Sequence, residues 1–190
     1  MRTIYYHFVL DASKSMVEHR EMLTLFVYKH FRKLAKCFRA REDERIEISY
    51  CMFNTSFRFF RFDETKKTRL EDLQKQFIPD NLSAIYDALG INIEHLNDVI
   101  EKQCVKYENQ VYFILLSDGH ENGSSIFTPM EVAEQIGCFQ QKNWKFIFIG
   151  SRMDIAAPEE ILELSDFRHY EIKKNELKGS FERIESIICR

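Results

Sequence analysis

Apolar and polar positions divide the chain into short continuous apolar runs and longer amphipathic stretches. Runs of six to eight mostly apolar residues that are rich in β-branched and aromatic types are typical of strands. The pattern predicts such strands at Thr3–Leu10, Ile46–Phe53, Phe57–Phe62, Gln110–Leu116, Trp144–Ile149 and Phe167–Ile172. Gln110–Leu116 is the most apolar run, and we expect it at the centre of the sheet.

Two of these strands are predicted to form a hairpin. Asn54-Thr55-Ser56 separates Ile46–Phe53 from Phe57–Phe62, and these three residue types favour a tight turn. Arg58 and Arg61 interrupt the second strand, which indicates an edge strand with one face in water.

The amphipathic stretches predict helices. The apolar positions Leu23, Val27, Phe31, Leu34 and Phe38 recur at three- and four-residue steps, as one buried helical face requires. A second stripe consists of Ile85, Leu89, Ile93, Leu96 and Ile100. Further helices are expected at Leu70–Phe77, after Thr128-Pro129-Met130-Glu131, at Asp154–Leu164 and at Ser180–Ile188.

The helix after Thr128 has the clearest start signal. Thr128 can cap the helix, Pro129 suits its first position, and Glu131 can complete a capping box. The alternation of strands and helices predicts an α/β fold: a doubly wound, mostly parallel sheet with one antiparallel edge strand and helices on both faces. We expect residues 1–190 to form one domain, since 190 residues suffice for one core and are few for two.

Composition and charge narrow the function classes. The formal net charge is −3 and no basic stripe stands out, so nucleic acid is not the expected partner. No apolar run approaches the roughly 20 residues that a membrane-spanning helix needs. The five cysteines are an odd number without metal-ligand spacing, which favours free thiols in a reducing compartment. No leader with a cleavage site precedes the first strand, and we expect a cytoplasmic protein.

Polar oxygen-bearing residues stand at three junctions between the predicted strands and helices. Asp11, Ser13 and Ser15 come after the first strand, Ser83 comes before the second long helix, and Asp118 comes after the most apolar strand. Each residue alone is most often a helix cap or a turn residue. In an open α/β sheet, however, ligands collect at the carboxyl ends of the strands, where these residues would meet.

Such a group of hydroxyl and carboxylate oxygens suits a hard cation. Mg²⁺ and Mn²⁺ prefer these donors, whereas Zn²⁺ prefers Cys and His. Because Asp11, Ser13 and Ser15 occupy alternate positions of one loop, their side chains can point the same way. Two carboxylates offset the charge of one divalent ion, and neutral hydroxyls leave it able to accept another anionic oxygen.

Three segments resemble the von Willebrand factor type A (vWA) family, and the resemblance spans most of the chain. Asp-Ala-Ser-Lys-Ser at positions 11–15 is similar to the family's Asp-x-Ser-x-Ser element, and residues 115–122 resemble its second aspartate motif. Residues 81–89 resemble the intervening segment, with Ser83 where threonine is usual and Asn81-Leu82 where glycines are usual.

The resemblance implies a metal-ion-dependent adhesion site and a protein-binding function. Its metal ligands would be Asp11, Ser13, Ser15, Ser83 and Asp118, and its cation Mg²⁺ or Mn²⁺. The partner would be another protein that supplies an Asp or Glu carboxylate, with a rim formed by Lys14, His120, Glu121 and Asn122. Stand-alone intracellular vWA proteins of bacteria, which act as subunits or adaptors, are the nearest type.

Two other functions remain open at this point. Asp11 at the tip of a strand resembles the nucleophile of a metal-dependent phosphatase or phosphotransferase. Such an enzyme needs an acid/base group two residues later, where this chain has Ser13. No phosphate-binding glycine loop, dinucleotide fingerprint or serine-hydrolase elbow occurs in the sequence, so we predict a protein that is not an enzyme. The other alternative is a vWA scaffold that binds no metal.

Overall fold

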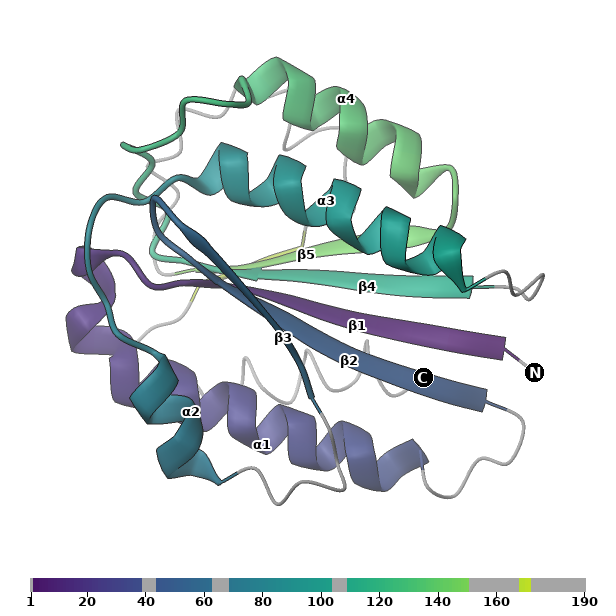
Figure 1. The fold of residues 1–190 in the computed structure, drawn as a ribbon, viewed down its shortest axis with the longest axis horizontal. Coiled ribbons are helices and arrows are strands. Elements are labelled where there is room, and N and C mark those ends of the chain that lie inside the picture. Colours follow the sequence, from purple (N-terminus) through teal and green to yellow (C-terminus); the bar gives the residue numbers. More distant parts are fainter. Residues whose placement is uncertain (1, 39–43, 63–68, 104–108, 151–167, 172–190) are drawn as a thin grey trace.

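A computed structural model describes residues 2–38, 44–62, 69–103, 109–150 and 168–171 of the chain. The helices predicted at Asp154–Leu164 and Ser180–Ile188 lie outside the described residues. In the described residues, helices cover both faces of a twisted sheet (Figure 1).

The sheet has six strands in the order β3-β2-β1-β4-β5-β6. All neighbouring pairs are parallel except β2 and β3, which are antiparallel. The strands are β1 (Arg2–Asp11), β2 (Glu44–Phe53), β3 (Phe57–Arg61), β4 (Asn109–Leu116), β5 (Trp144–Gly150) and β6 (Arg168–Glu171). The predicted fold class, a mostly parallel doubly wound sheet with one antiparallel edge, is therefore confirmed.

The two central strands are β1 and β4, and the chain order reverses between them. From β1 the chain first adds β2 and β3 on one side, then crosses to β4, β5 and β6 on the other. In the register of this pair Leu10 lies opposite Leu116, so Asp11 and Ser117 follow at neighbouring positions. A doubly wound sheet binds its ligands at such a reversal point, because the loops diverge there.

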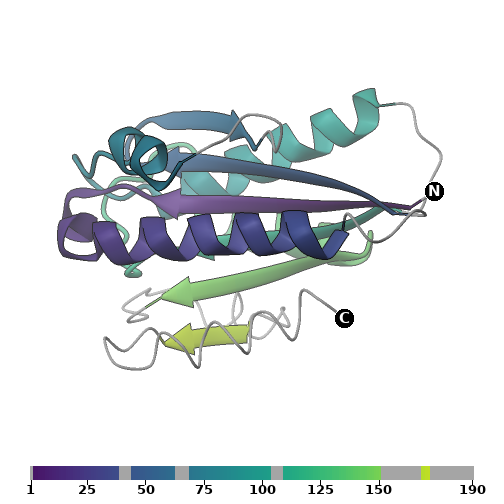
Figure 2. The same cartoon turned by 90° about the horizontal axis from the view of Figure 1, so that it is seen from below.

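The helices form two layers. The 3₁₀ helix η1 (Lys14–His19) leads into α1 (Arg20–Phe38), which shares one face of the sheet with α2 (Leu70–Gln76). The opposite face carries α3 (Ile85–Lys102) and α4 (Pro129–Gln140). Seen from the α1 side, α1 runs along the central part of the sheet (Figure 2). The capping box predicted for α4 is present: Glu131 N–H donates to Thr128 Oγ1, and Thr128 N–H donates to Glu131 Oε2.

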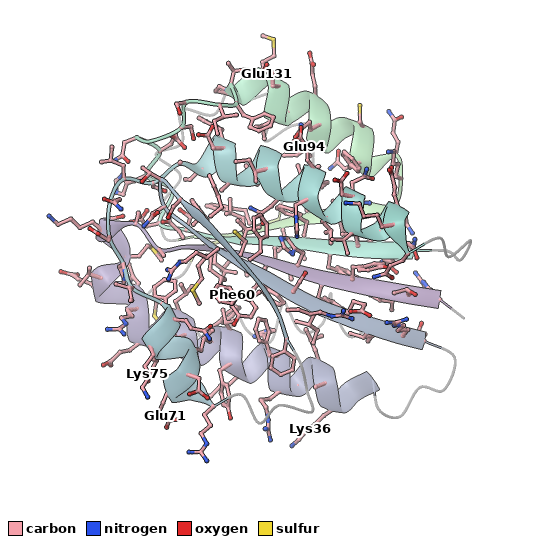
Figure 3. All side chains as sticks on the ribbon, in the orientation of Figure 1. Lys36, Phe60, Glu71, Lys75, Glu94 and Glu131 are labelled. Atoms are coloured by element: carbon pink, nitrogen blue, oxygen red, sulfur yellow. The ribbon has the colours of Figure 1, made fainter. Side chains whose placement is uncertain are left out.

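Successive side chains of β1 point alternately to the two faces of the sheet. Tyr6, Phe8 and Leu10 belong to the core under α1, whereas Tyr5 and Val9 belong to the core under α3 and α4. Both faces are covered, so the strand is buried along nearly its whole length and reads as a continuous apolar run. Figure 3 shows side chains filling the space between the sheet and both helix layers.

The edge strand β3 is at most partly buried along its whole length. Phe60 packs against the core under α1, whereas Phe59 is 37% exposed and contacts the ring of His95 on α3. Arg61 of this strand forms an ion pair with Glu47 of β2. The prediction of an edge strand with one face toward water is confirmed.

His7 is a buried polar residue in the middle of β1. Its Nδ1 lies 2.7 Å from Ser49 Oγ and its Nε2 lies 2.8 Å from Asn92 Oδ1. The amide nitrogen of Asn92 donates to the carbonyl of Ala88, so its amide oxygen faces the ring and can only accept. The proton therefore resides on Nε2, and Nδ1 accepts from the Ser49 hydroxyl. Both ring nitrogens therefore have partners within the core, and His7 is a packed histidine.

Burial lowers the pKa of His7 from 6.5 to about 4, because removal of the ring from water outweighs the hydrogen bond with Asn92, which acts in the opposite direction. In the unfolded chain, His7 becomes protonated as the pH falls through its ordinary pKa of 6.5. In the folded chain, His7 stays neutral until about pH 4. The free energy of unfolding should therefore fall between pH 6.5 and 4, by about 3 kcal/mol from this residue.

Urea unfolding of wild type and His7→Gln at a series of pH values tests this prediction. The wild type should lose more stability than the variant across the acid range. His19→Gln, which replaces a partly buried histidine of η1, is the matched control. Parallel pH profiles for wild type and His7→Gln would contradict it.

Candidate functional site

Three loops meet at the carboxyl ends of β1 and β4. Backbone hydrogen bonds join the first two loops: Lys14 N–H donates to the Asn81 carbonyl at 3.0 Å and Asp80 N–H donates to the Ala12 carbonyl at 2.9 Å. The second loop joins the third, because Asn122 N–H donates to the Ser83 carbonyl at 3.0 Å. The sequence-predicted site residues thus come from loops that are bonded to one another.

Asn81 gives the second loop its turn. Its φ of 61° lies in the left-handed region, which asparagine tolerates better than other residues with a side chain. This residue stands where the family that the sequence resembles usually has glycine, and it adopts a backbone conformation that glycine also favours. The turn lies between α2 and α3, which begins at Ile85.

The centre of the site is the carboxylate of Asp11, which has no exposed surface. Its Oδ1 accepts a hydrogen bond from Ser13 N–H at 2.8 Å. Its Oδ2 accepts from the Ser83 hydroxyl at 2.9 Å and from the Ser117 hydroxyl at 2.5 Å. One carboxylate therefore holds the first loop, the second loop and the segment that follows β4.

The serines of the first loop extend this arrangement outward. The hydroxyls of Ser13 and Ser15 lie 3.0 Å apart, Ser13 is buried and Ser15 is exposed. Ser13 N–H links this pair to Asp11 Oδ1, and the buried Ser83 hydroxyl binds Asp11 Oδ2, so hydrogen bonds connect the buried carboxylate to the exposed Ser15. Four of the five predicted ligands, Asp11, Ser13, Ser15 and Ser83, are thus connected by hydrogen bonds.

Asp118, the fifth predicted ligand, comes directly after Ser117 and is only 7% exposed. Its Oδ1 accepts from His120 N–H at 3.1 Å, and the Ser117 hydroxyl accepts from Gly119 N–H at 3.0 Å. Gly119 has a φ of 88°, a conformation that a side chain would strain. The Ser-Asp-Gly sequence therefore forms a tight turn that places a second acidic residue beside the Asp11 network.

Electrostatics make the Asp11 environment unusual. Burial raises the pKa of Asp11, and hydrogen bonds from Ser117, Ser13 and Ser83 oppose that rise. In the described part of the chain, no lysine, arginine or histidine forms an ion pair with Asp11 or Asp118. A buried carboxylate without a positive partner is costly, which leaves this position suited to a cation.

The donor set fits a hard cation and not a soft one. Within the described residues, no three His, Cys, Asp or Glu side chains gather where they could share a metal ion. Any cation at Asp11 would therefore depend on the serine hydroxyls and on water besides the carboxylates. Oxygen-only coordination of that kind suits Mg²⁺ or Mn²⁺.

Two of the four predicted rim residues have structural partners. Glu121 Oε2 accepts from the backbone N–H of Ile85 at 2.5 Å and of Tyr86 at 3.2 Å, so this carboxylate caps the N-terminus of α3. Asn122 Oδ1 accepts from Ser83 N–H at 2.8 Å. Lys14 and His120 are exposed, which leaves these two side chains available at the surface.

Asp87 anchors the outer part of the third loop. This buried carboxylate accepts hydrogen bonds of 2.8 to 2.9 Å from the backbone N–H groups of Ser125, Ile126 and Phe127. Asp87 therefore fixes the backbone of this loop close to the site. The loop also packs closely on α3, since a Cβ added at Gly90 would lie 2.6 Å from the Phe127 ring.

Ser117 and Glu121 are the residues whose roles sequence reasoning missed. Ser117 precedes the motif aspartate, and only the pairing of β1 with β4 shows that its hydroxyl reaches Asp11. Glu121 lies 36 residues from the helix that it caps, so no local capping pattern indicates it.

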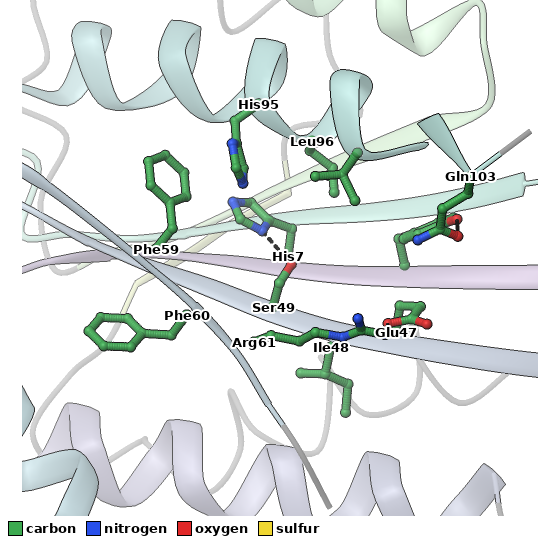
Figure 4. Close-up of a pocket in the computed structure, with 12 residues that line it drawn as sticks. His7, Glu47, Ile48, Ser49, Phe59, Phe60, Arg61, His95, Leu96 and Gln103 are labelled. Carbon is green, nitrogen blue, oxygen red and sulfur yellow. Dashed lines mark hydrogen bonds and ion pairs between the residues drawn. The ribbon is translucent and has the colours of Figure 1, made fainter. Parts of the chain in front are cut away.

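A separate cavity of about 230 Å³ lies between α3 and the edge of the sheet formed by β2 and β3 (Figure 4). Its lining includes His7, Ser49, Phe59 and His95, and none of the five predicted ligands. His7 and Ser49 bond each other there, as the dashed line in Figure 4 marks. The cavity therefore belongs to a different part of the molecule from the Asp11 network.

The hydrogen bonds to Asp87 can be tested by substitution. Asp87→Ala leaves three backbone N–H groups without their acceptor, and the free energy of unfolding should fall by about 3 kcal/mol. Asp98→Ala, at an exposed position of the same helix, should change it by less than about 0.5 kcal/mol. Urea unfolding measures both, and equal effects would contradict the anchoring role.

Comparison with known proteins places the fold. No family model and no curated protein matches the sequence. None of the described helices has the length and apolar character needed to cross a membrane.

Solved structures do match. The PilB minor pilin of Streptococcus sanguinis has a TM-score of 0.63 at 14% identity, with 98% of this chain and 61% of that one covered. A von Willebrand factor type A protein of Catenulispora acidiphila has a TM-score of 0.61 at 15% identity, covering 95% and 41%. The manganese-loaded TRAP protein of Plasmodium vivax has a TM-score of 0.57 at 16% identity, covering 94% and 71%.

The chain spans about 40 to 60% of the length of the pilin and of the Catenulispora protein. At these identities the likeness concerns the fold alone. The chain therefore has the α/β fold of von Willebrand factor type A domains.

Proposed function

We propose that this chain is a protein-binding module that captures a carboxylate of a partner protein through a divalent cation. Asp11, Ser13, Ser15, Ser83 and Asp118 would hold the cation, directly or through water, and Mg²⁺ or Mn²⁺ would serve. The bound cation would supply a positive centre with a position open to an Asp or Glu side chain of the partner.

The observation that carries this proposal is the state of Asp11. Its carboxylate is fully buried, an amide donates to Oδ1 and two hydroxyls donate to Oδ2, and no cationic side chain in the described residues balances its charge. A divalent ion would offset the charges of Asp11 and Asp118 together. The serine hydroxyls around them can rotate from donating to Asp11 to offering lone pairs to an ion.

Similar folds support the proposal by analogy. The Plasmodium TRAP structure is manganese-loaded, and another match is the SpaC pilus adhesin of Lactobacillus rhamnosus GG, with a TM-score of 0.69 at 10% identity. The first is a protein of similar fold that holds a divalent cation, and the second is one that is an adhesin. The residues of this chain that would do the same are the five named above.

The arrangement gives less support to phosphoryl transfer by Asp11. A nucleophilic carboxylate needs an oxygen that a substrate can reach, whereas both Asp11 oxygens are buried and accept hydrogen bonds. The residue two positions later, Ser13, has no acid/base function near neutral pH and is itself buried. A protein-binding module is therefore the function that the geometry supports best.

The cation is tested by thermal unfolding of the full chain with and without millimolar Mg²⁺ or Mn²⁺. At a cation concentration about 100 times the dissociation constant, the wild type should gain about 2.7 kcal/mol, or roughly 5 to 10 °C in Tm. Asp118→Ala should abolish this gain. Asp98→Ala, an exposed acid on α3, is the matched control and should keep it.

Asp11→Asn separates loss of the cation from loss of the fold. Asparagine has the same shape and can keep hydrogen bonds to Ser13, Ser83 and Ser117 while it removes the buried charge. The metal-free variant should therefore be at least as stable as metal-free wild type and should gain nothing from the cation. No shift in wild type at millimolar cation would contradict the proposal and favour a metal-free scaffold. Hydrolysis of p-nitrophenyl phosphate that Asp11→Asn abolishes would favour an enzyme instead.

A further inference from the structure

The cavity between α3 and the strands β2 and β3 has a wall of small and polar side chains on the sheet. In the strand register Tyr5 lies opposite Glu47. In the next row Ser49 lies between His7 and Arg61. Elsewhere on this face the sheet carries mainly large apolar side chains, which fill the space under the helices. The cavity therefore results from the residue types at this end of the sheet.

Polarity changes along the cavity. Figure 4 shows Phe59 and His95 toward one end, and the centroids of their rings are 4.1 Å apart. Arg61, Glu47 and Gln103 lie toward the other end, which we call the polar end. A mostly apolar cavity with a few polar groups at fixed positions is typical of a small-molecule site.

Two arginines share one carboxylate at the polar end. Glu47 forms ion pairs with Arg45, at 2.7 Å, and with Arg61. The side chain of Glu47 is 11% exposed, whereas those of Arg45 and Arg61 are 50% and 66% exposed. Asp98 and Lys102 of α3 pair with each other at 3.7 Å, so their charges offset. These five residues together carry one more positive than negative charge, which favours an anion over a cation.

The two histidines of the cavity add no positive charge near neutral pH. Burial lowers the pKa of His7 to about 4, and burial also lowers the pKa of His95 from its usual value of 6.5. Both ring nitrogens of His7 are bonded within the core, and the Ser49 hydroxyl donates to one of them. The His7 and Ser49 side chains therefore offer an anion neither charge nor a free donor.

Hydrogen-bond donors remain at the polar end. The Tyr5 hydroxyl donates to Gln103 Oε1 at 2.8 Å, so the amide nitrogen of Gln103 keeps its hydrogens for another acceptor. The guanidinium of Arg61 carries several N–H groups, more than its ion pair with Glu47 uses. An anionic group in the cavity is therefore best placed at the polar end, with an apolar group toward the other end.

We infer that this cavity binds a small carboxylic acid, in its anionic form, that contains a single aromatic ring. The ring would lie against Phe59 and His95, in the offset or edge contacts that aromatic groups prefer. The carboxylate would accept hydrogen bonds from Arg61 and Gln103. The volume of about 230 Å³ is below the roughly 300 to 1,000 Å³ of sites for larger ligands, so one ring fits and a nucleotide does not.

Phenylacetate is the probe for this inference, and NMR titration of the full chain measures its affinity. EDTA in the buffer keeps divalent cations away from Asp11, so the carboxylate has no metal ion to bind there. Three matched probes are phenylacetamide, which lacks the charge, phenethylamine, which reverses it, and acetate, which lacks the ring. Phenylacetate should bind at least about fivefold more tightly than phenylacetamide, because ionised acceptors form stronger hydrogen bonds with a guanidinium. Phenethylamine and acetate should bind more weakly than either.

Substitution of Arg61 tests the charge. Arg61→Gln should reduce the affinity for phenylacetate to about that for phenylacetamide and leave the affinity for phenylacetamide unchanged. The matched control is Arg58→Gln, which replaces an arginine of the same strand that does not line the cavity. This control should bind phenylacetate like the wild type.

Substitution of Val99 tests the location. Val99 lines the cavity and is 36% exposed, so Val99→Trp adds bulk at the opening without crowding the core. This variant should lose binding of phenylacetate and of phenylacetamide. Asn97→Trp, on the same helix but outside the cavity lining, is the matched control and should retain both.

Four results would overturn the inference. They are absence of phenylacetate binding to the wild type, equal affinities for phenylacetate and phenylacetamide, wild-type affinity in Arg61→Gln, and binding that Val99→Trp leaves unchanged. None of the five candidate cation ligands lines the cavity, and the titrations contain no free divalent cation. The proposed function is therefore tested separately, and either can fail without the other.

Discussion

Asp11 ends the central strand with a carboxylate that the fold has removed from water. The geometry of the whole carboxyl end depends on the hydrogen bonds made to it. Ser13 N–H fixes the first loop, the Ser83 hydroxyl fixes the start of α3, and the Ser117 hydroxyl fixes the exit from β4. In the described residues, no positive side chain lies beside Asp11. The hydrogen bonds therefore offset only part of the cost of burying its negative charge.

The sheet brings these loops together through a simple feature of its topology. The order in which strands are added to the sheet reverses between β1 and β4. The loops that leave these two strands therefore lead to helices on opposite faces of the sheet. Apolar burial on both faces fixes the register, because a slip by one residue would exchange Val9 and Leu10 between the two cores. Leu10 and Leu116 are consequently held opposite each other, and the polar residues that follow them meet.

Much of this arrangement was predictable from the sequence, for reasons that differ between elements. β1, β4 and β5 are apolar throughout because both of their faces are covered, and α3 reveals its buried side through Ile85, Leu89, Ile93 and Leu96. Local patterns also indicated the α4 cap and the site loops after strands. Ser117 and Glu121 escaped because their partners, Asp11 and the start of α3, are distant in sequence and are brought close only by strand pairing. The two helices predicted near the carboxyl terminus lie outside the described residues, and cation binding stays a prediction.

The hydrogen bonds of Asp87 have a mechanical consequence for the site. Asp87 is in the first turn of α3 and binds the backbone at residues 125–127, while Glu121 of the same loop binds the first residues of α3. The beginning of the helix and the loop are therefore tied by two carboxylates that point in opposite directions along the chain. A small rotation or sliding of α3 would carry Ser83 and Ile126 along as one rigid piece. A substitution that shifts the helix to move Ser83 would therefore displace Ile126 as well.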